Sequence, residues 1–199
     1  MKNRLSLLVL VLTTFLFSCN DDVTRKGDEL YNEGNYKEAV DAYSEYLKTN
    51  PKDIKSLYNR GRAYEEMKQL DNAKADFITV LDIDGDNVSA NLSMGKYWYN
   101  QKDFNKAIIF FDKVIELDGL RSDAYMLRGR SYHQKGDFDK AMENYNQAIN
   151  FDNDNAEAFL YRGALKIALN QTKTACQDFT RSKALGSLEA SDALAKHCR

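Results

Sequence analysis

Few residues in this chain lie in sequence patterns that carry catalytic or metal-binding chemistry. The two histidines are His133 and His197, and neither lies in a pattern that holds a metal ion or activates a nucleophile. The segment LDIDGDN, residues 81–87, resembles a calcium-binding loop only faintly, because Asn91 (counted from Gly85) or Leu92 (counted from Asp86) stands where such a loop needs its glutamate. We therefore interpret residues 81–87 as a turn and expect no catalytic site, no metal, no cofactor and no small-molecule substrate.

Cys19 follows a segment that differs from the rest of the chain. Lys2 and Arg4 precede an uncharged apolar run of about 13 residues, too short for the ~20 residues of a membrane-spanning helix. This order of charges and apolar residues is typical of a secretory signal peptide. The tetrapeptide LFSC, residues 16–19, resembles a lipobox, where a bacterial peptidase cuts before a cysteine that then carries lipid. We expect a signal peptide over residues 1–18 and a lipidated Cys19 with a short tether over residues 19–22; the alternative is an uncleaved anchor with an incidental cysteine.

The other two cysteines, Cys176 and Cys198, lie at similar distances on either side of a turn centred on Gly186. Two antiparallel helices of nearly equal length would bring them to the same level. An exported chain meets oxidising surroundings, in which such a pair can join. We expect a Cys176–Cys198 disulfide that adds about 3 kcal/mol; the alternative is two free buried thiols.

A repeat of 34 residues organises nearly all of the remaining chain. Glycine recurs at Gly27, Gly61, Gly95, Gly129 and Gly163, alanine at Ala39, Ala73, Ala107, Ala141 and Ala175, and an aromatic residue at Tyr43, Phe77, Phe111, Tyr145 and Phe179. Apolar residues within one period are spaced by three and four, so each period predicts two amphipathic helices. We expect the glycine of one helix to contact the alanine of its partner, with the aromatic side chain filling the space beside them.

These positions resemble the tetratricopeptide repeat, whose pattern is G-x-x-Y, then A-x-x-x-F, on a 34-residue period. Gly61 and Tyr64 match its first half, and Ala73 and Phe77 match its second. The resemblance implies an all-α, right-handed superhelical solenoid of five helix-turn-helix repeats over residues 23–187. Residues 188–199 then form a capping helix with an apolar face.

Arginine precedes the repeat glycine in three repeats, at Arg60, Arg128 and Arg162. Sixteen residues later come Asp76, Asn144 and Asp178, whereas the repeats without the arginine have Ala42 and Phe110 at that place. This covariation within one chain predicts an intra-repeat pair between the two helices, with ligand binding by the arginines as the lesser alternative.

The resemblance also implies where a partner binds, because the first helix of each repeat lines the concave face in similar proteins. The residues carried over to this groove are Tyr58, Arg62, Leu92, Lys96, Tyr99, Met126, Arg130 and His133. They suit an apolar segment with nearby acidic groups; the alternative is that some of them pack between neighbouring first helices. A carboxylate clamp known in part of this family is absent, because only Asn59 matches it.

Together these features predict a non-enzymatic protein-binding scaffold, anchored by lipid to the outer membrane on its periplasmic or surface side. The formal net charge of −2 and the lack of a long basic block argue against nucleic acid as a partner. The alternative is an accessory or regulatory subunit of an envelope enzyme or of a transport or assembly machine.

Overall fold

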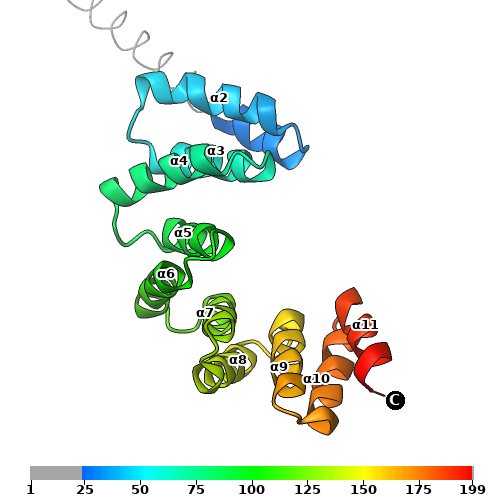
Figure 1. Cartoon of the computed structure of the whole chain (residues 1–199). Helices are drawn as coiled ribbons and strands as arrows, with labels where there is room; N and C mark the ends of the chain where they lie inside the picture. Colours follow the sequence, from blue (N-terminus) through cyan, green and yellow to red (C-terminus); the bar gives the residue numbers. More distant parts are fainter. Residues whose placement is uncertain (1–23, 199) are drawn as a thin grey trace, which may run out of the picture. The chain divides into compact units, whose positions relative to one another are not determined.

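The computed structural model describes residues 24–198, and in that part of the chain every regular element is a helix. The predicted all-α class is therefore confirmed, whereas the predicted signal peptide and Cys19 lie outside the described residues. A helix over residues 24–32 comes first. The helices that follow are α2 (Tyr36–Thr49), α3 (Ile54–Glu66), α4 (Leu70–Ile83), α5 (Val88–Asn100), α6 (Phe104–Leu117), α7 (Ser122–Lys135), α8 (Phe138–Phe151), α9 (Ala156–Ala168), α10 (Thr172–Ala184) and α11 (Leu188–His197) (Figure 1). Within residues 24–198, no helix is both long and apolar enough to cross a bilayer.

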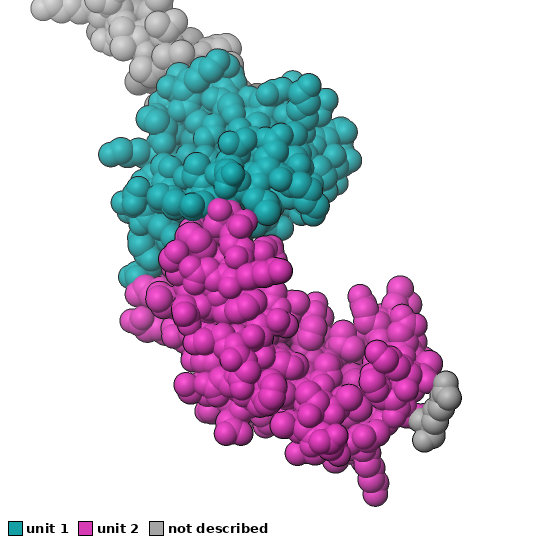
Figure 2. Space-filling model, in the orientation of Figure 1, with its two compact units in different colours: residues 1–90 teal, residues 91–199 magenta. Residues whose placement is uncertain are grey.

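The chain forms two compact units, coloured separately in Figure 2. Unit 1 ends at Ala90 and unit 2 begins at Asn91. In unit 1, α3 packs against α4; in unit 2, α7 packs against α8 and α9 against α10. These pairs are the two helices of single repeats, so each predicted helix-turn-helix repeat is a hairpin.

The turn inside each hairpin has one residue with a left-handed backbone. Gly34 and Gly136 have φ values of 80° and 78°, and Lys68, Lys102 and Asn170 have values close to 60° at the equivalent place. Glycine accepts this conformation without steric cost, and the other residues adopt it at some expense. The same turn therefore recurs on the 34-residue period even where glycine is missing.

Polar side chains begin several of the first helices. Asp53, Asn87 and Asn155 each accept a hydrogen bond from the backbone N–H three residues later, at 2.8, 3.0 and 2.9 Å. Such a cap provides an acceptor for one of the backbone N–H groups that the start of a helix leaves unpaired. The helix α7 differs, because the side chain of its N-cap residue, Arg121, makes no cap bond.

Each repeat glycine lies against the aromatic ring of its own repeat. A Cβ atom added at Gly61 would stand 2.6 Å from Phe77 Cε1, and one added at Gly163 would stand 2.6 Å from Phe179 Cε1. We expected each repeat glycine to contact the alanine of the partner helix. The nearest atoms are instead those of the aromatic ring, and the missing glycine side chain makes room for that ring. The five rings are at most 1% exposed, so this contact forms the centre of every hairpin.

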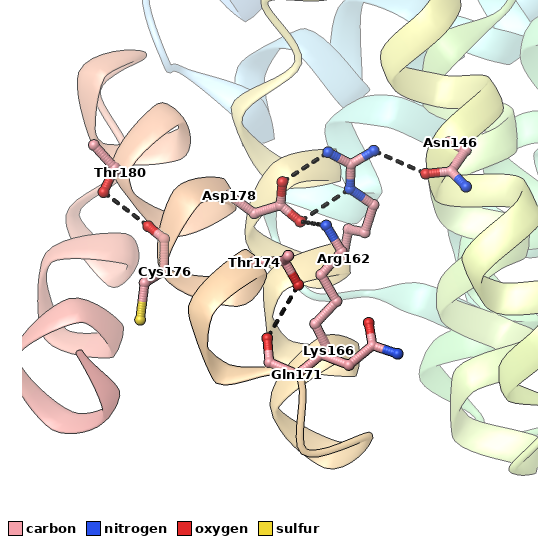
Figure 3. Close-up of polar contacts among 8 residues, drawn as sticks. All are labelled: Asn146, Arg162, Lys166, Gln171, Thr174, Cys176, Asp178 and Thr180. Carbon is pink, nitrogen blue, oxygen red and sulfur yellow. Dashed lines mark hydrogen bonds and ion pairs between the residues drawn. The ribbon is translucent and has the colours of Figure 1, made fainter.

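The arginine pairs predicted from covariation are confirmed. Arg162 Nη2 and Nε donate to the two carboxylate oxygens of Asp178 at 2.7 and 2.9 Å (Figure 3). The same guanidinium donates through Nη1 to Asn146, sixteen residues earlier, at 2.8 Å. Since Asn146 lies on α8 and Asp178 on α10, the arginine of α9 joins two repeats as well as the two helices of its own.

The first two arginines repeat this arrangement. Arg60 donates to Asp76 and to Ser44, and Arg128 donates to Asn144 and to Asp112. These bonds account for the arginines as structural links, so the ligand-binding alternative is not needed for them.

Lys166 explains how the fifth repeat departs from the pattern. It takes the place of Tyr64 and Tyr132 in the first helix, and its Nζ lies 2.8 Å from Asp178 Oδ2 (Figure 3). Asp178 is 6% exposed and so has two cations as partners, Arg162 and Lys166. A buried carboxylate needs such partners, because an unpaired buried charge is strongly destabilising.

The last helix is tied covalently to the fifth repeat. Cys176 of α10 and Cys198, at the end of α11, form a disulfide with a Cα–Cα distance of 5.7 Å. Ala190 of α11 is buried, while Asp192 and Lys196 are exposed. This helix therefore covers the end of α10 with one face and presents the other to solvent.

We predict that Gly163→Ala destabilises the protein by roughly 1–3 kcal/mol, because the new methyl group would overpack against Phe179. The measurement is the free energy of unfolding by denaturant. Gly119→Ala is the matched control, since its nearest neighbour would be Ile115 O at an ordinary 3.7 Å. Equal stability of the two variants would contradict the role assigned to the ring contact.

Candidate partner-binding surface

In unit 1 the first helices border a polar pocket of about 300 Å³. It is lined by Asp28, Tyr31, Asn32, Tyr43, Tyr58, Asn59 and Arg62. Two of these residues, Tyr58 and Arg62, were predicted for the groove. The others come from the helix over residues 24–32, from α2 and from α3, so the pocket belongs to the first two repeats.

Asp28 is the centre of the polar network in this pocket. It accepts hydrogen bonds from Tyr43 Oη at 2.7 Å, Lys55 Nζ at 2.7 Å and Asn59 Nδ2 at 2.9 Å. Burial alone would raise the pKa of Asp28, but these hydrogen bonds outweigh it, so the pKa lies below its usual value. Asn59, the one residue that matched the carboxylate clamp, is thus engaged with a carboxylate of the protein itself.

Arg62 is neutralised by its own helix. Its Nε lies 3.0 Å from Glu65 and its Nη2 lies 4.0 Å from Glu66. Tyr58, one turn earlier, is half-buried, with its ring centroid 5.6 Å from that of Phe77. At this pocket, Tyr58 and Arg62 therefore offer aromatic area and a paired arginine.

In unit 2 the central feature is Arg130 of α7, which lies between two tyrosines. Its Cζ atom is 4.9 Å from the ring centroid of Tyr99 on α5 and 4.1 Å from that of Tyr161 on α9. The three residues come from the first helices of three successive repeats. At these distances cation–π attraction between the guanidinium and the two rings is favourable.

Lys96 and His133 are two further residues of unit 2 that were predicted for the groove. Lys96 is exposed, and its charge helps to lower the pKa of Asp123. His133 packs edge-on against Phe138, and its Nδ1 lies 3.4 Å from the hydroxyl of Tyr145. Burial lowers the pKa of His133, which favours the neutral form of its imidazole.

Two predicted groove residues are not on the surface. Leu92 is 8% exposed and Met126 is 3% exposed, so neither is available to a partner. Both side chains belong to the buried hydrophobic core of the first helices. The alternative stated for such residues, packing rather than binding, describes both of them.

Sequence reasoning missed the surface next to Arg130. Tyr161 and Leu160 line a hollow of about 380 Å³ together with Leu188 and two acids, Glu157 and Glu189. Leu188 is 82% exposed. The signal that could have found this hollow is a large apolar residue directly after the Gly186 turn, where a capping helix begins.

Within residues 24–198, no group of three His, Cys, Asp or Glu side chains is placed to hold a metal ion. The chemistry that these surfaces offer is therefore that of aromatic stacking, hydrogen bonding and ion pairing.

Two family models match the chain. The model described as TPR repeat matches residues 27–68 and 129–169, and the model described as tetratricopeptide repeat matches residues 54–87 and 88–119. Together they cover most of the repeats. The chain belongs to the tetratricopeptide repeat family, and this membership indicates a protein–protein interaction scaffold.

Curated relatives share short stretches with this chain. Sperm-associated antigen 1 of Mus musculus is 39% identical over 66 residues, which are 33% of this chain and 7% of that protein. Hsp70-Hsp90 organizing protein 1 of Glycine max is 33% identical over 64 residues, which are 32% of this chain and 11% of that protein. The chain thus matches only a small part of each relative's length.

Solved structures resemble the whole fold more completely. MamA from Desulfovibrio magneticus RS-1 is 20% identical with a TM-score of 0.76, over 83% of this chain and 94% of that one. PilW, described as a type IV pilus biogenesis factor, is also 20% identical with a TM-score of 0.76, over 83% of this chain and 77% of that one. At this identity the likeness establishes the fold.

The Asp28 network predicts a pH dependence. A carboxyl whose pKa is lowered by folding stabilises the protein above its unfolded-state pKa of about 3.9, and this stabilisation is lost as the pH falls through the lower folded-state value. We expect Asp28→Asn to be destabilised at about pH 6 and to lose less stability than wild type between about pH 5 and pH 2.5. The measurement is the urea-unfolding midpoint by circular dichroism at several pH values. Asp41→Asn, an exposed change on α2, should keep the wild-type acid dependence; the same loss in both variants would refute the role of Asp28.

Proposed function

We propose that this chain is a non-enzymatic scaffold of a bacterial envelope, anchored through lipid on Cys19, that holds a protein segment against the first helices of its repeats. The observation that carries this proposal is the surplus of large side chains on those helices. Each hairpin is filled by its own buried aromatic ring, yet Tyr58, Tyr99 and Tyr161 remain half-exposed on the first helices. Tyrosine and arginine at such places supply much of the binding energy in protein interfaces.

Two features support an exported and anchored chain. The LFSC tetrapeptide resembles a lipobox, and the Cys176–Cys198 disulfide fits an oxidising compartment such as the periplasm or the cell surface. Only residues 20–23 separate Cys19 from the first described helix. An anchor at Cys19 would therefore keep unit 1 close to the outer membrane, on its periplasmic or surface side.

A second candidate is an accessory subunit of an envelope enzyme or of a transport or assembly machine. It is favoured by the likeness in fold to PilW, which is described as a type IV pilus biogenesis factor. Both candidates use the same first-helix surface. They differ in whether one partner is bound in fixed proportion or several partners are bound in turn.

Affinity capture from detergent extracts tests the surface and separates the candidates. Wild-type protein should retain one partner in fixed proportion if it is a machine subunit, and variable partners if it is a general scaffold. Lys96→Glu, on the exposed face of α5, should reduce capture of acidic partners at least several-fold through charge repulsion. Lys173→Glu on α10, also exposed, is the matched control and should bind as wild type does. Loss of capture in both variants, or in neither, would contradict this placement.

The lipid anchor has its own test. In cells fed labelled palmitate, wild-type protein should take up the label, while Cys19→Ala should accumulate as an unlabelled precursor of larger mass. Cys198→Ala, which removes a cysteine at the other end, should still be labelled. Wild-type protein without label would refute the anchor and leave the scaffold proposal to the capture experiment.

A further inference from the structure

Arg130 differs from every other arginine that the structure describes. Arg25, Arg60, Arg62, Arg121, Arg128, Arg162 and Arg181 each have an ion pair with a carboxylate of the protein. Among residues 24–198, Arg130 alone of the arginines has neither an ion pair nor a hydrogen bond to another residue. It is nevertheless half-buried, so its charge is partly removed from water without a counterion.

The two tyrosines contact this guanidinium through their rings, Tyr161 at 4.1 Å and Tyr99 at 4.9 Å. Neither accepts a hydrogen bond from it, so its N–H donors remain for another group. The planar N–H donors of a guanidinium match the two oxygens of a carboxylate. Aromatic walls also strengthen such a pair, because they reduce the water around it.

The neighbouring hollow adds an apolar contact. Tyr161 borders Arg130 on one side and lines the hollow with Leu160 and the exposed Leu188 on the other. A protein segment that placed an acidic group at Arg130 would therefore have an apolar surface within reach of an adjacent side chain.

The local charge selects the kind of anion. Arg130 supplies one positive charge, while Glu157 and Glu189 line the adjacent hollow. These two acids repel a phosphate, with its greater negative charge, more strongly than a single carboxylate. The charge of one carboxylate can be balanced by Arg130.

We propose that Arg130, held between Tyr99 and Tyr161, binds a carboxylate of the partner segment, and that an apolar side chain of the same segment occupies the hollow lined by Leu160, Tyr161 and Leu188. This inference rests on the proposed scaffold function and names the chemistry of its partner: an acidic residue next to an apolar one. It assigns the recognition of acidic groups to Arg130 rather than to Arg62, which Glu65 already neutralises.

The test uses a library of random linear heptapeptides displayed on phage and selected on the full chain in detergent. Enriched peptides should contain Asp or Glu beside an apolar residue. One such peptide and its amide counterpart (Glu→Gln or Asp→Asn) are then titrated against wild type, Arg130→Gln and Arg62→Gln. Arg130→Gln should weaken the acidic peptide about tenfold, as expected for loss of a charged hydrogen-bonded pair. Arg62→Gln should change its Kd less than threefold.

The two substitutions should also be coupled. Once the peptide carries the amide, Arg130→Gln should have little further effect, because both remove the same ion pair. The comparison of acid and amide peptides on wild-type protein needs no variant and so stands even if Arg130→Gln folds poorly. Peptides that bind without acid preference, or an unchanged Kd in folded Arg130→Gln, would overturn the carboxylate site and leave the scaffold in place. A selection that enriches no peptide would contradict the scaffold function itself.

Discussion

The contact between a buried aromatic ring and a glycine backbone is the interaction on which each repeat depends. The second helix supplies the ring and the first helix supplies the glycine, whose lack of a side chain lets the ring come within van der Waals distance of the helix. Because this contact recurs every 34 residues, the two helices touch at the same positions in every hairpin. Arginine links then join a first helix to the second helices of its own and the preceding repeat, as Arg162 joins Asp178 and Asn146.

In this arrangement, part of each first helix is not needed for the packing of its hairpin. In each hairpin the second helix supplies the buried aromatic ring and the first helix supplies the glycine, while other positions of the first helix carry large side chains that are only half-buried. Tyr99, Arg130 and Tyr161 occupy such positions in unit 2, where both rings contact the guanidinium. Tyr161 also packs against the core cluster of Ala141, Tyr145 and Leu165. A surface built this way can change its side chains without disturbing the fold, which is why solenoids of one family differ in their partners.

The sequence alone predicts the features that recur with the repeat. It does not predict the surroundings of individual side chains. The helix pairs and the Arg162–Asp178 link follow from spacing, because spacing determines which residues face each other within a hairpin. The neutralisation of Arg62 by Glu65 and the burial of Met126 depend on side-chain rotamers and on neighbouring repeats, which a periodic pattern does not specify. For the same reason the sequence pattern placed Arg62, Lys96 and Arg130 alike in the groove, while the structure singles out Arg130.

The central claim is that partners bind the first helices and not the second. Photo-crosslinking in living cells tests it most directly, with p-benzoylphenylalanine at Ala164 on α9 or at Ile109 on α6, both of which are exposed. The account predicts a crosslinked partner from position 164 and none from position 109. Crosslinks from position 109 alone, or equally from both positions, would contradict it.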